Sequence, residues 1–508
     1  MYKRQPIYHR EAKEPAYLEG VRDFTLDGID DLDDPAKALE RLLAWPSIAS
    51  KNWVYRQYDH MVRAGTAINP GSNAAVIRLK ADSYPPLLSD TPQNGIPDKY
   101  LAMSVDCNGA HVYLDPYEGS KATVAEAARN LVCSGARPLG ATDNLNFGNP
   151  HNPELFWQLK ESVRGLAEAC EAFGTPVTGG NVSLYNQNPA GAIDPTPTVG
   201  MVGLVESPEN ITTQWFKDEG DAVILFGQAV NVDDPLLGLG GSALLQTEHG
   251  RKEGTPPPCD LAKESALHDA LLGLIETGVV KSAHDCAEGG LTVALAECCI
   301  SQLTARNTAR LTGASIDLEG IDCARFDALL FGESHGRVVI TTAEAESGAA
   351  VERAKLLGVP AARIGTVTGG DTLDIVSGEI HLSWHSILPQ ARKYGKENVT
   401  QGPVGPLRLF GKTISEPILS FAAPAPTILS LESLLAESQT AMESSMNRVA
   451  ELNAEVAGFR SRLDQFKYSM PITWVGGAMF VCLLAGFLGG LWWVDRASRR
   501  RHGGIRIY

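Results

Sequence analysis

Short apolar runs alternate with helical stripes of apolar residues through residues 46–388, which predicts two α/β units. In the unit at 46–215, helices are expected at 123–134 and 154–173, the second with its apolar residues on one face. Gly135 and Gly174 follow these helices directly, as residues that end helices often do. Strands are expected at four apolar runs: 102–105, 112–114, from 176, and 198–205.

The unit at 220–388 repeats this alternation. Strands are expected at 222–226, 337–342 and 364–367. Helices are expected between them, at 261–277, 290–301 and 343–357. Residues 1–45 are acidic and only partly periodic, with a helix at 36–43, and they are interpreted as a linker into the first unit.

The pattern changes after residue 388. Residues 389–430 are rich in Pro, Ser and Gly and are interpreted as a second linker. Apolar residues then recur every seven positions through 431–467, which indicates a coiled-coil helix, with a single amphipathic helix as the open alternative. The uncharged stretch 472–494 has 23 residues and tryptophans near both ends, which predicts one transmembrane helix; a buried core helix is the alternative.

Charge around this stretch gives conflicting information on orientation. Four arginines lie between 496 and 501, so the positive-inside rule places the C-terminus in the cytosol and the α/β units outside. Long domains follow that rule poorly, and the composition of these units is that of a cytosolic enzyme. We therefore expect cytoplasmic catalytic domains, anchored to a membrane by the C-terminal helix.

Overall charge and cysteine usage narrow the class of protein. The net charge of -16 argues against a nucleic-acid partner, because such a partner requires a basic face. The nine cysteines form no CxxC pair and are interpreted as reduced thiols of a cytosolic enzyme. The N-terminus shows no apolar segment of a secretory signal.

Two polar segments are the main candidates for chemistry. The first, 142–149, contains Asp143 between an expected strand and a helix, and the second, 178–186, contains Gly180, Asn181 and Ser183. Glycine lets backbone amides approach a phosphate, and the asparagine carbonyl suits Mg²⁺. An Asx-rich turn that caps the next helix, or a plain glycine turn, explains each segment alone equally well.

Further acidic residues lie at expected element ends. Asp106 follows a strand, Asp285 and Glu288 precede a helix, and Glu333 lies just before another strand together with His335 and Arg337. Each has a structural alternative. Asp106 is explained as a turn aspartate, and Asp285 and Glu288 as acidic residues that stabilise a helix N-terminus. Arg337 either holds a phosphate or merely pairs with Glu333. Walker, protein-kinase, GxGxxG and GxSxG motifs are all absent from the sequence.

Several segments in sequence order carry a family resemblance: 53–59, 106–108, 125–130, 143–149 and 179–186. They resemble the second half of the large subunit of phosphoribosylformylglycinamidine synthase, from about residue 8 to about residue 390. The resemblance implies the aminoimidazole ribonucleotide synthetase fold. This is a PurM-like N-terminal α+β domain at 46–215, whose sheet serves pseudo-dimer formation, and a PurM-like C-terminal α/β domain at 220–388.

The resemblance also implies a reaction, the ATP-dependent amidation of formylglycinamide ribonucleotide in purine biosynthesis. ATP and Mg²⁺ are the implied cofactors, and the implied partners are a glutaminase subunit and a small bridging subunit. By motif, Asp143 and Gly180 would contact ATP, Asn181 would bind the metal, and Ser183 would bind the substrate. Asp106, Asp285 and Glu333 would serve an auxiliary nucleotide site, and no catalytic residue is assigned.

Departures from the family leave the activity open. The family's first half, with the catalytic histidine and most acidic metal ligands, is missing, and Arg56 lies near where such a histidine would fall. The hypotheses are a ligase active only with the missing half, or a catalytically silent, membrane-anchored nucleotide-binding scaffold. Selenophosphate synthetase and thiamine-monophosphate kinase are weaker alternatives, because the 144–149 segment favours the synthase.

Overall fold

The computed structural model describes residues 9–55, 57–80, 98–300, 312–321, 323–378 and 380–385, with two short strands at 408–409 and 412–413. The coiled coil expected at 431–467 and the transmembrane helix expected at 472–494 lie outside the described residues, as does most of the linker at 389–430. Within the described part of the chain, every helix is too short or too polar to span a membrane.

A six-stranded sheet forms the first unit, in the order β1-β2-β3-β8-β4-β5. Its strands pair antiparallel, except that β4 and β5 run parallel and β5 lies at the edge. The bounds are β1 Thr66–Ile68, β2 Ala75–Leu79, β3 Lys99–Asp106, β8 Thr196–Val205, β4 Arg137–Asn146 and β5 Val177–Ser183. A small hairpin follows β5, made of β6 Gln187–Asn188 and β7 Gly191–Ala192.

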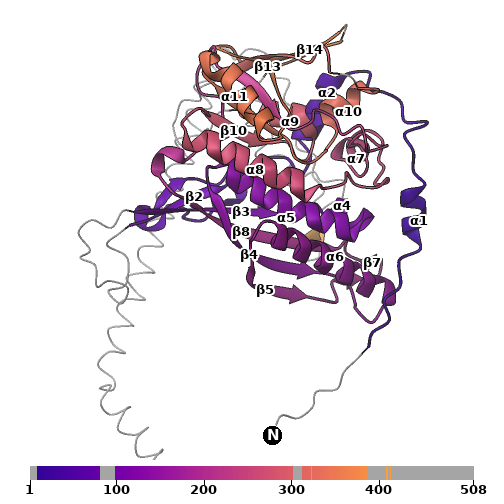
Figure 1. Ribbon diagram of the computed structural model, residues 1–508. Coiled ribbons are helices and arrows are strands. Elements are labelled where there is room, and N and C mark those ends of the chain that lie inside the picture. The colour runs from indigo at the N-terminus through magenta and orange to yellow at the C-terminus, as the bar shows by residue number, and fades with distance from the viewer. Residues whose placement is uncertain are drawn as a thin grey trace, which may run out of the picture. The chain divides into compact units, whose positions relative to one another are not determined.

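Helices cover one face of this sheet (Figure 1). They are α4 Gly109–Leu114, α5 Pro116–Cys133 and α6 Pro153–Ala172. The strand expected at 112–114 is wrong, because these residues belong to α4. The side chains of Asn108 and Asp115 accept backbone N–H groups at the starts of α4 and α5, and Pro116 fits the first turn of α5.

The opposite face of the six-stranded sheet exposes large apolar side chains. Ala102, Ser104 and Met201 point toward the helices and are buried, whereas Met103 and Val202, which pair across β3 and β8, are each 38% exposed. Val105 is 74% exposed. Successive side chains of a strand point to opposite faces, so the exposed residues share one face. Exposed apolar residues that share one face of a sheet are common at interaction surfaces.

A seven-stranded sheet forms the second unit, in the order β10-β12-β9-β13-β11-β14-β15. All its strand pairs are antiparallel except β11 with β14. The bounds are β9 Ala222–Phe226, β10 Ser282–Asp285, β11 Gly313–Asp317, β12 Val338–Thr342, β13 Ala361–Thr368, β14 Thr372–Ser377 and β15 Ile380–His385.

Helices pack on both faces of the seven-stranded sheet. Ile224 and Ile340 share a core cluster with the helices α8 Leu261–Glu276 and α11 Glu344–Leu356. Val223 and Val339, which point to the other face, pack with α9 Gly290–Cys299 and α10 Phe326–Phe331. Further helical segments are α1 Tyr17–Arg22, α3 Asn52–Tyr55, η1 Val62–Ala64, η4 Pro208–Asn210 and α7 Ala243–Glu248.

The N-terminal segment is part of this second core. Helix α2, Pro35–Leu43, begins with Asp34 capping the Lys37 amide and buries Leu39 and Leu42 completely. Both leucines belong to the cluster that contains α9 and α10. The end of the stretch expected as a linker is therefore a packed helix of the second unit.

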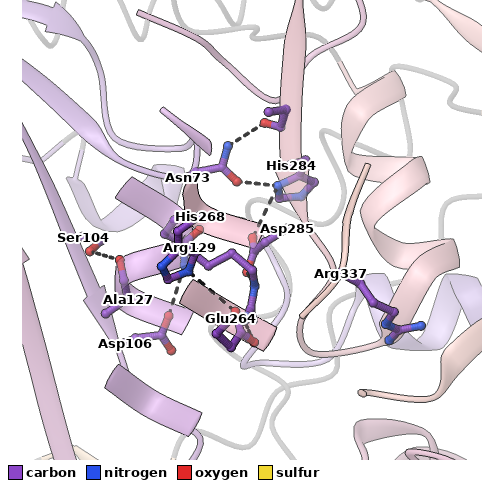
Figure 2. Close-up of polar contacts among 12 residues, drawn as sticks. Asn73, Ser104, Asp106, Ala127, Arg129, Glu264, His268, His284, Asp285 and Arg337 are labelled. Carbon is purple, nitrogen blue, oxygen red and sulfur yellow. Dashed lines mark hydrogen bonds and ion pairs between the residues drawn. The ribbon is translucent and has the colours of Figure 1, made fainter. Parts of the chain in front are cut away.

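A buried polar network joins the two units (Figure 2). Arg129 on α5 is fully buried, and its Nη1 donates to Glu264 Oε1 on α8 at 2.7 Å. Its Nε lies 3.6 Å from Asp285 Oδ2 on β10. Nearby, Asn73 donates from Nδ2 to the Ala283 carbonyl at 2.8 Å. The junction of the units thus contains a buried ion pair as well as apolar contacts, and Arg129 Nε and Nη2 have no hydrogen-bond partner there.

Both ring nitrogens of His284 lie within hydrogen-bond distance of side-chain oxygens at this junction. Asn73 Oδ1 lies 2.6 Å from Nδ1, and the Glu297 carboxylate lies 2.7 Å from Nε2. The Asn73 amide nitrogen is engaged by Ala283, so its oxygen faces the ring. Burial lowers the pKa of His284, but the hydrogen bond and charge of Glu297, with the charge of Asp285, outweigh it and raise the pKa above its usual value.

We expect this histidine to make stability depend on pH in a defined direction. Because its pKa is higher in the folded state, its contribution to the free energy of unfolding is complete below the pKa of the unfolded state, near 6.5. That contribution is lost as the pH rises through the pKa of the folded state. Urea unfolding between pH 6 and 9 should show a fall in midpoint that His284→Gln largely removes. The exposed His381, which lies 3.5 Å from Asp374, provides the control, since His381→Gln should leave the fall unchanged. An identical pH profile in His284→Gln would contradict the prediction.

Candidate functional site

Strands β4 and β5 bring the two polar segments side by side. Their parallel register pairs Asp143 with Gly180, Asn144 with Asn181, and Asn146 with Ser183. Beyond the strands, the Phe147 amide donates to the Ser183 carbonyl at 3.0 Å, and the Asn186 amide donates to the Phe147 carbonyl at 3.1 Å. The two segments, 37 residues apart, therefore lie side by side, with β5 at the free edge of the sheet.

The site residues lie in strands rather than in the expected turns. Asp143 and Asn144 are paired on both sides, with β5 and with β8, and Gly180 to Ser183 are the last residues of β5. Asn and Asp are depleted in strands, so the sequence pattern favoured a turn. The ladder hydrogen bonds to both neighbours override that preference.

Asp143 points to the helix-covered face, and Gly180 leaves the space for its carboxylate. Ala141 and Leu145, two residues away on either side, are buried in the core under the helices. A Cβ atom built on Gly180 would lie 2.3 Å from Asp143 Oδ1 and 2.6 Å from the Asp143 carbonyl oxygen. Burial raises the pKa of Asp143. Only glycine fits at position 180 without displacing the carboxylate.

Asn181 and Asn144 lie on the other, open face. Both are exposed, and Asn181 Nδ2 donates to Asn144 Oδ1 at 3.1 Å. Ser183 is partly buried and exchanges hydrogen bonds with Asn186, whose Nδ2 donates to the Ser183 carbonyl at 2.8 Å. Because β5 is the edge strand, a ligand that lies along this edge reaches both faces of the sheet.

Tyr185 is a feature of the site that the sequence did not reveal. It has a φ of 67°, in the region that bulky residues rarely adopt, and the residue is 54% exposed. Its amide donates to the Gly148 carbonyl at 3.3 Å, which ties the two segments together. The ring lines a shallow depression with residues 186–188 and 190–193, directly after Ser183. Strained backbone of this kind is concentrated at ligand sites.

Two family models match the chain. AIR synthase related protein, N-terminal domain, matches residues 71–205, and the corresponding C-terminal domain matches residues 218–377. Together they cover more than half of the chain and correspond to the units of the six-stranded and the seven-stranded sheet.

The chain belongs to the AIR synthase related protein family. Among curated proteins it is similar to phosphoribosylformylglycinamidine synthase subunit PurL of Anaeromyxobacter sp. (strain K), with 42% identity over 390 residues. The same subunit of Moorella thermoacetica is 43% identical over 393 residues. Each comparison covers 76% of this chain and 49% of the relative, so the chain spans about half the length of the relatives it matches.

A solved structure shares the fold. The T. maritima PurL structure complexed with FGAR superimposes with a TM-score of 0.51 at 17% sequence identity. The superposition covers 77% of this chain and 55% of that chain. It bears out the expected PurM-like architecture of two successive units of the AIR synthase related family.

Two of the residues expected at an auxiliary site lie together at the junction of the two family domains. Asp106, at the end of β3, accepts from Asn130 Nδ2 at 3.2 Å. Burial raises its pKa, and the charges of Asp285 and Glu288 raise it further. Burial likewise raises the pKa of Glu126, with Asp106 and Asp285 adding to the effect. Figure 2 shows Asp106 and Asp285 beside Arg129, the cation that lowers these pKa values again.

Glu333, the third auxiliary residue, is engaged by backbone groups. Its Oε1 accepts the amides of Ala243 and Gly289, both at 2.8 Å, at the starts of α7 and α9. The neighbouring Arg337 neither pairs with Glu333 nor lies free for a phosphate, because it donates to the carbonyls of Ala229, Gly332 and Ser334. Both side chains hold loops and helix ends in place.

Glu288 is a further buried carboxyl group in this region. Burial and the charge of Glu333 raise the pKa of Glu288 to about 7. Across the described ranges, no three His, Cys, Asp or Glu side chains are arranged to hold a metal ion. The sequence did not single out Glu126 or Arg129 for chemistry, because charged residues inside a helix are normally solvated. Arg129 is buried where α5 packs against α8 and β10.

Proposed function

We propose that this chain is the second half of a phosphoribosylformylglycinamidine synthase, and that it contributes the ATP-binding edge of β4 and β5 to the ATP-dependent amidation of formylglycinamide ribonucleotide. The observation that carries the proposal is the strand register that pairs Asp143 with Gly180 and Asn144 with Asn181. The names of the curated relatives and of the T. maritima complex support the reaction class and the substrate.

We assign to the four site residues the roles that the family resemblance implies. Asp143 and the Gly180 backbone would contact ATP along the helix-side edge, and Ser183 would bind the ribonucleotide next to Tyr185. Asn181 would offer its carbonyl oxygen to Mg²⁺, which prefers oxygen ligands. When bound, the metal would neutralise triphosphate charge. The fit is partial, since this edge offers a single neutral oxygen and the remaining ligands would come from the triphosphate and from another half.

The chain supplies an incomplete site. The exposed apolar face with Met103, Val105 and Val202 is the surface we assign to the missing first half, which would bring the acidic ligands and the catalytic histidine. Asn181 lies on that same face, so docking would enclose it between the halves. A glutaminase subunit and a small bridging subunit would supply ammonia.

In the assembled enzyme, this chain would act by binding and orientation. The edge would fix the triphosphate against the amide oxygen of the substrate, and the docked face would exclude water from the phosphorylated intermediate. Ammonia would then displace phosphate. No proton transfer is assigned to a residue of this chain.

The remaining parts of the organisation are proposals as well. We place the domains at 46–215 and 220–388, a cytoplasmic location for both, and a coiled coil and membrane anchor beyond residue 430. The anchor rests on the sequence pattern alone, because its residues lie outside those that the structure describes.

Complementation tests the proposal. Residues 1–395 are mixed with the first half of a relative, formylglycinamide ribonucleotide, ammonia and MgATP, and amidine formation is followed. We expect activity that Asn181→Ala reduces at least tenfold, since it loses a metal ligand, and that Asn231→Ala, a change in a loop of the other domain, leaves intact. A folded complex without activity would favour the silent scaffold and overturn the proposal.

A further inference from the structure

The hairpin that follows β5 has little support of its own. Its strands β6 and β7 have two residues each, all of them exposed, and an isolated hairpin of two strands is only marginally stable in water. Tyr185 at its start has a φ of 67°, a conformation that persists only where surrounding contacts hold it. The Ile193 amide donates to the Asn186 carbonyl at 3.0 Å and closes the hairpin, and Asp194 follows directly.

Lys252, in a loop of the second domain, contacts this hairpin at Asp194. Its Nζ lies 2.7 and 2.9 Å from the two carboxylate oxygens of Asp194, 58 residues away in the sequence. The same ammonium group lies 3.9 Å from the ring centroid of Tyr113 on α4. The Lys252 side chain is 32% exposed, so water screens the ion pair and the cation–π contact less than it would on an open surface.

Both supports of Lys252 are packed structures. Tyr113 stacks on Tyr17 of α1 with ring centroids 4.5 Å apart, and the Tyr17 hydroxyl donates to the Tyr113 carbonyl at 2.7 Å. The loop that carries Lys252 is tied back to α7, because the Arg251 amide donates to the Leu245 carbonyl at 3.0 Å. Lys252 therefore connects the hairpin to two helices, one in each domain.

A short series of contacts leads from Asp194 to Ser183. Asp194 is the neighbour of Ile193, whose amide is bound to Asn186. Asn186 Nδ2 in turn lies 2.8 Å from the Ser183 carbonyl oxygen and 3.2 Å from its hydroxyl oxygen. Tyr185, between these two residues, lines the shallow depression that follows Ser183. Loss of the contact at Asp194 would therefore loosen the groups that surround the Ser183 hydroxyl.

We propose that Lys252 is a positioning residue for the ribonucleotide site. By holding Asp194, it fixes the hairpin at 185–194 in the position in which Ser183 and Tyr185 meet the substrate. The proposal rests on the function proposed above for Ser183, and it assigns to Lys252 no contact with the substrate. The substrate site of the first domain thus depends on a contact made by the second domain.

Hydrogen exchange of the full chain tests the structural part of the proposal without any ligand. In Lys252→Met we expect the hydrogen-bonded amides of Tyr185, Asn186 and Ile193 to exchange about tenfold faster, because the ion pair and the cation–π contact no longer oppose local opening. Lys252→Arg keeps the charge and can stack on the Tyr113 ring, so its exchange should match that of the wild type.

Lys121 provides a matched control. It also pairs with a carboxylate, Glu118 at 2.8 Å, and lies 5.1 Å from a tyrosine ring centroid, that of Tyr117. All three residues belong to α5, so these contacts join no separate segments. Lys121→Met should therefore leave exchange in the hairpin unchanged. Equal exchange in Lys252→Met and Lys121→Met would overturn the inference.

Steady-state kinetics test the consequence for the substrate. The full chain is combined with the first half of a relative, and amidine formation is measured with ammonia and MgATP. In Lys252→Met we expect the KM for formylglycinamide ribonucleotide to rise about tenfold. We expect kcat and the KM for MgATP to stay within about twofold of the wild type, because the hairpin is assigned to ribonucleotide binding alone. A merely structural role would reduce the amount of active enzyme, and so kcat, without raising this KM.

Ser183→Ala separates failure of the inference from failure of the proposed function. If Ser183→Ala raises the KM for the ribonucleotide and Lys252→Met does not, the inference is overturned and the substrate role of Ser183 stands. Faster exchange in Lys252→Met with an unchanged KM has the same meaning. A folded assembly without activity, or a KM that Ser183→Ala leaves unchanged, would remove the proposed role of Ser183 and this inference with it.

Discussion

Replacing Gly180 with alanine is expected to weaken nucleotide binding strongly and to destabilise the edge of the sheet. The new Cβ would lie 2.3 Å from Asp143 Oδ1 and 2.6 Å from its carbonyl oxygen, and one of these atoms is backbone that is held between β5 and β8. Overpacking of this kind costs about 1–3 kcal/mol of unfolding free energy. The displaced carboxylate should weaken MgATP binding at least tenfold, measured by calorimetric titration.

The adjacent glycine gives the matched control. A Cβ on Gly179 meets no heavy atom within 4 Å, so Gly179→Ala changes the same backbone in the same way without the collision. We expect its MgATP affinity and unfolding midpoint to stay within twofold and about 0.5 kcal/mol of the wild type. If both alanine variants bind MgATP equally well, the edge of β4 and β5 is not the nucleotide site.

The second large effect is expected from Arg129→Met at the domain junction. This change leaves Glu264 buried without its 2.7 Å partner and Asp285 without its nearest cation. Removal of one member of a buried ion pair costs about 3–5 kcal/mol, which chemical denaturation at pH 7 would detect. Arg164→Met, at an exposed arginine paired with Glu161 on α6, should cost no more than about 1 kcal/mol.

The acid side of the stability curve should change as well. Burial raises the pKa of Glu264, but Arg129, His268 and His335 outweigh it and lower the pKa to about 2. The stability that this carboxylate contributes is therefore present above its unfolded pKa, near 4.3, and is lost as the pH falls toward 2. In Arg129→Met, the free energy of unfolding should depend less on pH between about 4 and 2. A variant with wild-type stability at pH 7 would show that the charge network does not hold the domains together.

The sequence predicted the elements whose apolar pattern is long and regular. Helices α6 and α8 and strands β8 and β9 lie within one or two residues of their expected bounds, because burial of one stripe or of a continuous run sets the pattern. The three-residue run at 112–114 was assigned to the wrong class, since so short a run fits a strand or one turn of a helix. The capping residues Asn108 and Asp115 were the signals that distinguish the two.

The candidate site was predictable in its residues and not in its arrangement. Asp143 and Asn181 were chosen for their chemistry, and the two segments do converge as expected. Their opposite faces follow from strand register, which depends on pairing between distant segments. The same limit applies to Arg129 and Glu264, which are 135 residues apart and meet only when α5 packs against α8.

The packing of α2 into the second domain has a consequence for folding during synthesis. The buried residues Leu39 and Leu42 are made before the elements that cover α2, which packs against α7, α9 and finally β15, made some 340 residues later. At about 5–20 residues per second, synthesis of the residues from α2 to β15 takes tens of seconds, and the apolar face of α2 is not fully covered during that time. We therefore expect the nascent chain to bind chaperones. A truncation that removes residues 1–45 would leave the apolar surface that α2 covers exposed to solvent in the folded domain.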